Sequence, residues 1–239
     1  MLTKMTTKII TMVTTTIIEA PGSSLLRLLQ LVSPTLPIGA FAYSQGLETA
    51  IERRWVHDEH TASHWIAGLL RRSVGTLDVP VFARLYAAFE GGDMNAVAKW
   101  NAFILACRGA AELHAEDRNL GAAFMKVFAT LTASKLAVHS ATAYVTAFAQ
   151  AAAHFAIPRD TAAFGFVFAW AESQVSAAVR LVPLGQSEGQ RILLNLTDVL
   201  QESVATGLAL PDDDISSTAP GHAMGSALHE TQYSRLFRS

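Results

Sequence analysis

The chain has 239 residues, of which 51% are hydrophobic and only 16% are charged, and its formal net charge is −2. A typical soluble domain is about 25% charged, so this chain carries little charge for its size. The near-neutral balance argues against a nucleic-acid-binding protein, which would show a basic stripe. The single cysteine, Cys107, excludes a disulfide framework and any metal or redox site built on a Cys-x-x-Cys pair.

The sequence divides into three parts. Residues 1–23 are rich in threonine, which interrupts the apolar stretch that a secretory signal needs, so we expect a poorly ordered N-terminal extension and a cytoplasmic protein. Residues 24–210 show helical spacing of apolar side chains and form one predicted domain. Residues 211–239 contain turn-forming residues without a periodic core, which predicts a separate C-terminal tail.

Within the domain, Ser24 is a candidate N-cap of the first helix, which ends where two prolines and a glycine occupy residues 33–39. Asp78 followed by Pro80 predicts a helix start, and Asp93 predicts another. Ser187 is a candidate cap of the last helix. The further helices are expected at residues 43–54, 58–73, 78–91, 93–107, 110–131, 136–156, 160–182 and 188–208. The sequence therefore predicts an all-α, single-domain bundle of about nine to ten helices.

The longest uncharged run, residues 136–158, is long enough to cross a bilayer. Alanine dominates this run, and several serine, threonine, glutamine and histidine side chains interrupt it. Unpaired polar groups cost roughly 2–7 kcal/mol each in hydrocarbon, so we expect a buried helix in the core or at an interface and no membrane span.

Common catalytic motifs are absent from the sequence. Nothing fits the GxxxxGK[ST] phosphate-binding loop, the HExxH zinc motif or the GxSxG nucleophile motif. The glycines at 185 and 189 lack the spacing and the preceding strand of a dinucleotide-binding loop and indicate a turn between helices. Cys107 follows an apolar helical stretch, where burial would raise its pKa and make it unreactive.

Two groups of polar residues lie close together in the sequence. His57, His60 and His64 fall on one helical face and could hold zinc, nickel or copper, or could be solvated side chains at a helix start. A metal-dependent helical enzyme or a metallochaperone using these histidines is the alternative function. A second group indicates an ordinary charged face with i, i+4 spacing, and its members are Arg108, Glu112, Glu116 and Arg118.

Polar residues also lie inside an apolar helix and in the tail. Glu172 and Gln174 would need partners if buried, and Arg180 is near the same face as Glu172. In the tail, Tyr233, Leu236 and Phe237 have amphipathic helical spacing beside two arginines. The tail either docks on its own domain or binds a partner on which it becomes ordered.

Five separated segments resemble, in order, the pattern of the UreF family of urease accessory proteins. These segments are Leu28–Glu48, Asp78–Tyr86, Ala111–Arg118, Ala177–Gln186 and His229–Ser239. The resemblance covers essentially residues 24–239, and Ala42 departs from it because the family usually has a larger or hydroxyl-bearing residue there. Residues 1–23 and the histidine trio are not part of the family pattern.

The resemblance implies a cytoplasmic, non-catalytic, all-α protein that dimerises and bridges UreD (also called UreH) and the GTPase UreG while nickel is delivered to apo-urease. It implies that this chain binds no cofactor of its own, because GTP belongs to UreG and nickel is the cargo. It implies that the contact with UreG is made by Tyr43, Ser44, Gln45, Gly46, Glu48, Arg180 and Gln186. It implies that the contact with UreD/UreH is made by Tyr233, Arg235, Leu236, Phe237 and Arg238. Glu48 and Arg180 either act on the GTPase or merely connect helices.

Overall fold

The computed structural model describes residues 22–132 and 141–239. Within these ranges the chain is built of helices and contains no strand, which confirms the predicted all-α class. The predicted N-terminal extension lies outside the described residues apart from Gly22 and Ser23. The elements are α1 (Ser23–Leu31), η1 (Ala40–Ala42), α2 (Leu47–Glu52), α3 (Glu59–Leu69), η2 (Leu70–Asp78), α4 (Val79–Gly91), α5 (Met94–Ala106), α6 (Ala111–Thr132), α7 (Tyr144–His154), α8 (Arg159–Leu181), α9 (Gln186–Asn195), α10 (Thr197–Ala209), η3 (Asp212–Asp214) and α11 (Pro220–His229).

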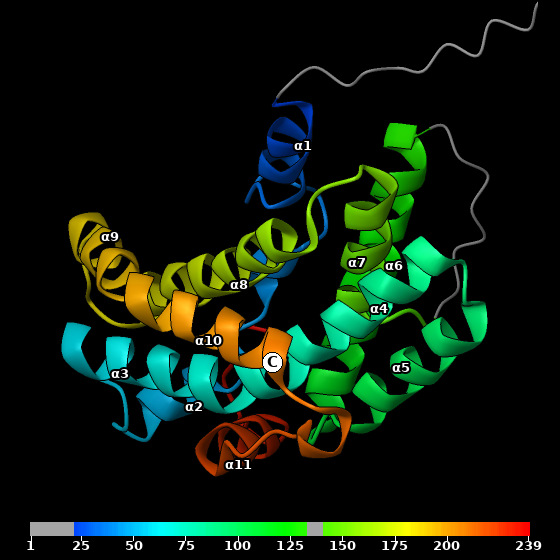
Figure 1. The fold of residues 1–239 in the computed structure, drawn as a ribbon. Helices are drawn as coiled ribbons and strands as arrows, with labels where there is room; N and C mark the ends of the chain where they lie inside the picture. Colours follow the sequence, from blue (N-terminus) through cyan, green and yellow to red (C-terminus); the bar gives the residue numbers. More distant parts are fainter. Residues whose placement is uncertain (1–21, 133–140) are drawn as a thin grey trace, which may run out of the picture.

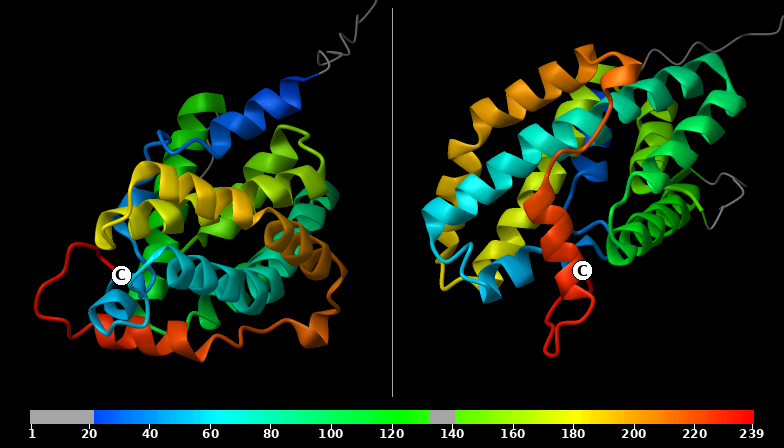
Figure 2. Two further views of the ribbon diagram at one scale, coloured as in Figure 1. Left: turned by 90° about the vertical axis from the view of Figure 1, so that its left-hand side faces the viewer. Right: turned by 90° about the horizontal axis from the view of Figure 1, so that it is seen from below.

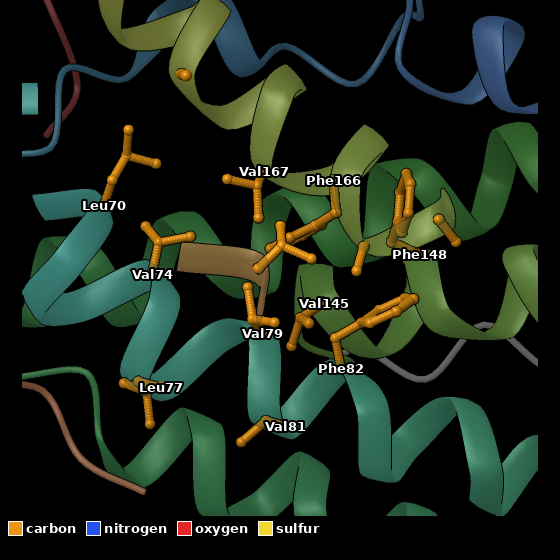
Figure 3. Close-up of a cluster of buried hydrophobic side chains, with 14 of the residues drawn as sticks. Leu70, Val74, Leu77, Val79, Val81, Phe82, Val145, Phe148, Phe166 and Val167 are labelled. Carbon is orange, nitrogen blue, oxygen red and sulfur yellow. The ribbon is translucent and has the colours of Figure 1, made fainter. Parts of the chain in front are cut away.

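The core surrounds α4, which packs against α5, α7, α8 and α10. Phe82 of α4, Phe148 of α7 and Phe166 of α8 are buried, and their rings meet with centroids 5.4–6.2 Å apart. Figure 3 shows these three side chains converging from three helices. Aromatic pairs at this separation stabilise a core beyond the area that they bury. Helix α1 lies at one edge of the molecule and α11 at the opposite edge (Figure 1).

One continuous helical segment replaces two predicted helices. The sequence pattern predicted an end near Ser73 and a new start capped by Asp78, but the chain stays helical from Glu59 to Gly91 through the π-helix η2. Asp78 has helical dihedral angles and makes no capping bond. Pro80 lacks an N–H, so it cannot bond the carbonyl of Thr76 within the helix. That carbonyl instead accepts a hydrogen bond from the N–H of Ser216, at 3.1 Å.

Other helix ends match or differ for identifiable reasons. Asp93 caps α5 by accepting from Asn95 N and Ala96 N, as predicted. Ser24 and Ser187 are not caps, because α1 begins one residue before Ser24, and Gly185 precedes α9. The predicted helix 188–208 is divided at Leu196, which is buried and ends α9. The predicted helix 136–156 falls partly outside the described residues, and α7 begins only at Tyr144.

We expect Gly121→Ala to destabilise the fold by about 1–3 kcal/mol. A Cβ at Gly121 in α6 would lie 2.0 Å from the carbonyl oxygen of Thr142 and 2.8 Å from the carbonyl carbon of Ala143. These are backbone atoms, which cannot move aside as the end of a side chain can.

Chemical denaturation measures the difference, with Gly68→Ala in α3 as the matched control. A Cβ at Gly68 meets no atom within 4 Å, so this change should stabilise the helix by up to about 1 kcal/mol. Equal effects of the two substitutions on the free energy of unfolding would show that α6 does not lie this close to residues 142–143.

Candidate functional site

The segment of residues 43–46, which was predicted to begin a helix, instead forms a turn before α2. Gln45 and Gly46 have left-handed backbone conformations, with φ of 53° and 76°. A Cβ at Gly46 would lie 2.8 Å from Ser226 N of α11, so only glycine allows this close approach. The turn directs the N–H groups of Ser44 and Gln45 at one acceptor, a backbone oxygen of Ser239, at 2.7 and 3.0 Å.

Glu48 joins this turn to the C-terminal segment. One carboxylate oxygen accepts from Leu236 N at 2.7 Å, and the other accepts from Phe237 N at 2.9 Å. The second oxygen also lies 3.2 Å from Nε2 of His229, a fully buried ring. Nδ1 of the same ring lies 2.6 Å from Glu112 Oε2. Glu48 is itself buried, and therefore its carboxylate is engaged inside the molecule.

Glu116 of α6 is the most deeply placed carboxylate near this turn, with 4% of its surface exposed. It accepts from Gln45 Nε2 at 2.7 Å and from the Ser239 hydroxyl at 2.6 Å. The other end of the Gln45 amide accepts from the indole N–H of Trp170 in α8 at 2.9 Å. Burial raises the pKa of Glu116 to about 7, although the two hydrogen bonds oppose that rise.

Arg108, in the turn between α5 and α6, holds together two buried carboxylates. Its guanidinium lies 2.5 Å from Asp78 Oδ1 and 2.8 Å from Asp117 Oδ2. Burial opposes the charged form of Arg108, but Asp117 and Asp78 outweigh it and raise its pKa. The other oxygen of Asp117 accepts from Tyr144 N at 2.7 Å. This network therefore connects the end of η2, α6 and the start of α7.

Three neighbouring cavities lie in this polar interior, and some residues line more than one of them. An inner cavity of about 50 Å³ shares Gln45, Glu116 and Trp170 with a cavity of about 260 Å³ that reaches Phe41 and Arg180. It shares Arg108 and His222 with a third cavity of about 270 Å³, which Cys107 also lines.

Two buried polar atoms beside these cavities have no hydrogen-bond partner among the described residues: Gln174 Oε1 and His222 Nε2. Burial, with the nearby charge of Arg108, lowers the pKa of His222 to about 4, so its ring is neutral at pH 7. Burial also raises the pKa of Glu172, and Arg180 opposes that rise, so the predicted proximity of these two residues is confirmed.

The charged face predicted near Arg108 is not an exposed one. Glu116 and Asp117 are buried, and Glu112 and Arg108 have side chains only 15% and 17% exposed. The sequence did contain a signal for this burial. Glu116 and Asp117 lie between Leu113 and Leu120 on one face of α6, and that apolar face is buried. Asp78, Asp117 and His222 were missed as site residues. Asp78 meets Arg108 across 30 positions of sequence, and His222 is brought to the same interior only by the packing of α11.

The remaining predicted residues fall into exposed and buried groups. Arg180 is exposed and donates to the carbonyl oxygen of Phe41 at 3.1 Å, and Gln186 is exposed at the start of α9. In the tail, Phe237 is buried, whereas Tyr233 and Leu236 are exposed. The residues after His229 form turns and bends, not the amphipathic helix that their spacing would allow. Arg235 lies 2.7 Å from Glu112, and Arg238 N donates to the carbonyl oxygen of Ala42.

The structure also bears on two alternatives, a metal site at the three histidines and a membrane-spanning helix. Among residues 22–132 and 141–239, no group of three or more His, Cys, Asp or Glu side chains is placed to hold a metal ion, so His57, His60 and His64 do not form such a site. In the same ranges, α8 is the one helix long and apolar enough to cross a membrane, and half of its apolar window is buried inside the fold. A partly buried core helix can be as long and as apolar as a membrane-spanning helix, so these two properties do not distinguish them.

Comparison with known proteins gives a consistent result. Residues 56–197 match the model of the UreF family. The protein named urease accessory protein UreF from Alkalilimnicola ehrlichii is 45% identical over 222 residues, which cover 92% of this chain and 97% of the relative. The protein of the same name from Chromohalobacter salexigens is 44% identical over 214 residues, which cover 89% of this chain and 93% of the relative.

Proposed function

Because the chain belongs to the UreF family of urease accessory proteins, we propose that it is a non-catalytic scaffold in the nickel-dependent maturation of urease. In this role it bridges UreD (UreH) and the GTPase UreG on apo-urease, in the cytoplasm. Nickel is the cargo of the assembly, and GTP is bound by UreG. The chain acts on the GTPase by binding one of its conformations more tightly than the other, which is how a partner without a catalytic group shifts such an equilibrium.

The observation that carries the proposal is the presentation of apolar side chains at the surface of a chain that is poor in charge. Tyr233 and Leu236 are 105% and 68% exposed on the C-terminal segment. Exposed apolar groups of this kind mark sites of protein–protein contact when they cluster. We assign Tyr233 and Leu236 to the contact with UreD/UreH.

The proposed UreG contact uses Arg180 and Gln186, whose side chains are exposed. Ser44, Gly46 and Glu48 are buried, and Tyr43 is 6% exposed. These residues, with the partly buried Gln45, therefore contribute by fixing the turn and the C-terminal segment.

A second apolar surface supports the proposal of a homodimer. Leu25, Leu26 and Leu29 are more than half exposed on α1, and Phe164 and Phe168 are 43% and 45% exposed on α8, against which α1 packs. Covering this surface with a second copy would remove apolar area from water. We accordingly expect the isolated chain to dissolve poorly and its partners to improve its solubility.

The experiment that tests the proposal is capture of purified UreD and UreG, followed by urease activation with and without the chain. We expect the double substitution of Tyr233 and Leu236 by alanine to weaken UreD/UreH capture at least about tenfold, because hot-spot residues, among which tyrosine is enriched, cost about 2 kcal/mol or more when truncated. Since both side chains are exposed, the melting temperature should stay nearly unchanged.

The matched control replaces two exposed apolar residues elsewhere, Met94 and Leu194, which are 62% and 72% exposed. This control should keep UreD/UreH capture. Capture of neither partner by the parent chain would refute the scaffold role, and undiminished capture by the double variant would refute the assignment of Tyr233 and Leu236.

A further inference from the structure

We propose that the cavity of about 260 Å³ beside α8 is a binding site for a small organic cation that carries N–H donors on an apolar body, such as an arylalkylammonium. The walls of this α8 cavity come from the segment that links α1 to α2, from α6, from the start of α7 and from α8. In the right view of Figure 2 the linking segment, drawn in blue, runs between α8 and α6. The inference concerns the chain by itself and goes beyond the scaffold role.

The walls and the size of the α8 cavity suit an apolar body that contains one ring. Aromatic side chains line it from several elements, and these are Phe41, Tyr43, Tyr144 and Trp170. A dry apolar cavity of about 150 Å³ holds a benzene molecule, so about 260 Å³ leaves room for a ring with a short charged arm. Aromatic faces also attract cations. One such contact already exists at the outer end of the cavity, where the guanidinium carbon of Arg180 lies 5.9 Å from the ring centroid of Phe41.

Gln174 of α8 supplies an unused hydrogen-bonding group to this cavity. Its side chain is 1% exposed and lines the cavity, and its Oε1 has no hydrogen-bond partner within the described part of the chain. A buried polar atom without a partner costs free energy, which a ligand donor would recover. The terminal torsion of glutamine is soft, so the amide can turn its oxygen toward a ligand. The amide of Gln45 has no such freedom, because Glu116 and Trp170 hold it at both ends.

The charged groups that line the cavity favour a cation over an anion. Among the described residues that line it, Glu116 and Glu172 are acidic and Arg180 is the single basic residue. Arg180 is already engaged, since it donates to the carbonyl oxygen of Phe41 at 3.1 Å. Glu116 already accepts two hydrogen bonds, so Glu172 is the carboxylate left for a ligand. Burial raises the pKa of Glu172, and Arg180 opposes that rise; a ligand cation nearby would oppose it further.

Gln174 and Glu172 would act on the ligand in different ways. They are two residues apart on α8, which places them roughly 200° apart around the helix, on the two sides of the strip that the cavity follows. Gln174 lies one turn from Trp170, on the side where the indole N–H meets the Gln45 amide. A donor of the ligand can therefore bond Gln174 directly, whereas Glu172 acts through its charge from the other side. The two contributions can be measured separately.

The test is a titration of the full chain with benzylammonium, with benzyl alcohol as the neutral comparison and benzoate as the anionic one. The indole ¹H–¹⁵N signal of Trp170, assigned with Trp170→Phe, reports on the cavity because this N–H bonds Gln45 at the cavity wall. We expect benzylammonium to move this signal in a saturable way and benzyl alcohol to bind at least about fivefold more weakly, because it lacks the charge that Glu172 attracts. Benzoate should not move the signal. The indole signals of Trp55 and Trp100, which do not line the cavity, should stay in place.

Two substitutions separate the two contacts. Gln174→Met keeps the length of the side chain and removes its amide, so it should weaken both benzylammonium and benzyl alcohol by about fivefold. Its melting temperature should not fall, because the amide oxygen that it removes is buried without a partner among the described residues. Glu172→Gln should weaken benzylammonium by about fivefold and leave benzyl alcohol unchanged. The matched controls, Gln201→Met and Glu202→Gln, change exposed residues of α10 outside the cavity and should alter neither affinity.

Three results would overturn the proposal. The first is an unmoved Trp170 signal at concentrations of benzylammonium up to tens of millimolar. The second is binding of benzoate as tight as that of benzylammonium, because apolar walls alone would then account for it. The third is an unchanged affinity for benzylammonium in both Gln174→Met and Glu172→Gln. The titration uses the chain alone, so its result is independent of whether UreG or UreD/UreH is captured.

Discussion

Replacing Arg108 with alanine is expected to lower the free energy of unfolding by about 3–5 kcal/mol, the usual loss when one member of a buried ion pair is removed. The guanidinium is the shared partner of Asp78 and Asp117, whose side chains are 9% and 5% exposed. Without it, two buried carboxylates face each other with no compensating charge. Burial already raises the pKa of Asp78 despite Arg108, and the loss of Arg108 would raise it further.

Denaturation of Arg71→Ala supplies the matched control. Arg71 pairs with Glu202 across an exposed surface, with side chains 47% and 55% exposed, and such pairs contribute about 0–1 kcal/mol. If Arg108→Ala lowered the free energy of unfolding no more than Arg71→Ala does, the network that joins η2, α6 and α7 would not contribute to stability as described. Because the Arg108 variant leaves its carboxylates able to take up protons, its deficit should shrink as the pH is lowered.

Glu116→Gln is expected to change how stability depends on pH, by about 3 kcal/mol between pH 4.5 and pH 8. The pKa of Glu116 rises from its ordinary 4.5 to about 7 in the folded protein, and each pH unit is equivalent to about 1.4 kcal/mol. A raised folded pKa means that the folded state holds the proton more tightly. Its stabilising contribution is therefore complete below pH 4.5 and is lost as the pH rises through 7.

Glutamine has the same shape and remains neutral, so the variant should gain stability relative to the parent as the pH rises. Its carbonyl can still accept from Gln45, and its amide can donate to the Ser239 hydroxyl. Urea denaturation at pH 5, 6, 7 and 8 gives the difference directly, and the contributions of His222 and Asp78 cancel because both proteins contain them. Glu202→Gln removes an exposed carboxylate and should leave the profile unchanged. A constant difference between parent and Glu116→Gln would show that Glu116 is not held protonated in the fold.

The burial of Glu48 changes what its substitution can report. The family resemblance placed Glu48 on the UreG side, but its carboxylate bonds the backbone of residues 236 and 237 and the ring of His229. Loss of urease activation in a Glu48 variant would therefore reflect a displaced C-terminal segment as readily as a lost contact with UreG. Arg180, which is exposed, gives the cleaner test of the UreG side.

The local sequence determined those features that depend on neighbouring residues. The cap at Asp93, the capping box that begins α3 at Asp58 and the end of α4 at Gly92 were all readable, because side chain and backbone partners lie within four residues. The apolar spacing of α8 was readable for the same reason, and the order of five motifs was sufficient to identify the family.

Only the tertiary structure decided which polar residues form the interior. Glu48 meets Leu236 and Phe237, Glu116 meets Ser239, and Arg108 meets Asp78, across 188, 189, 123 and 30 positions of sequence, respectively. A helical pattern assigns a charged residue to the solvent unless a distant partner compensates its burial, and such a partner has no signature within a few residues. The turn at Gln45 and Gly46 was missed for the same reason, because its left-handed backbone is stabilised by the distant Ser239 and by the close approach of α11.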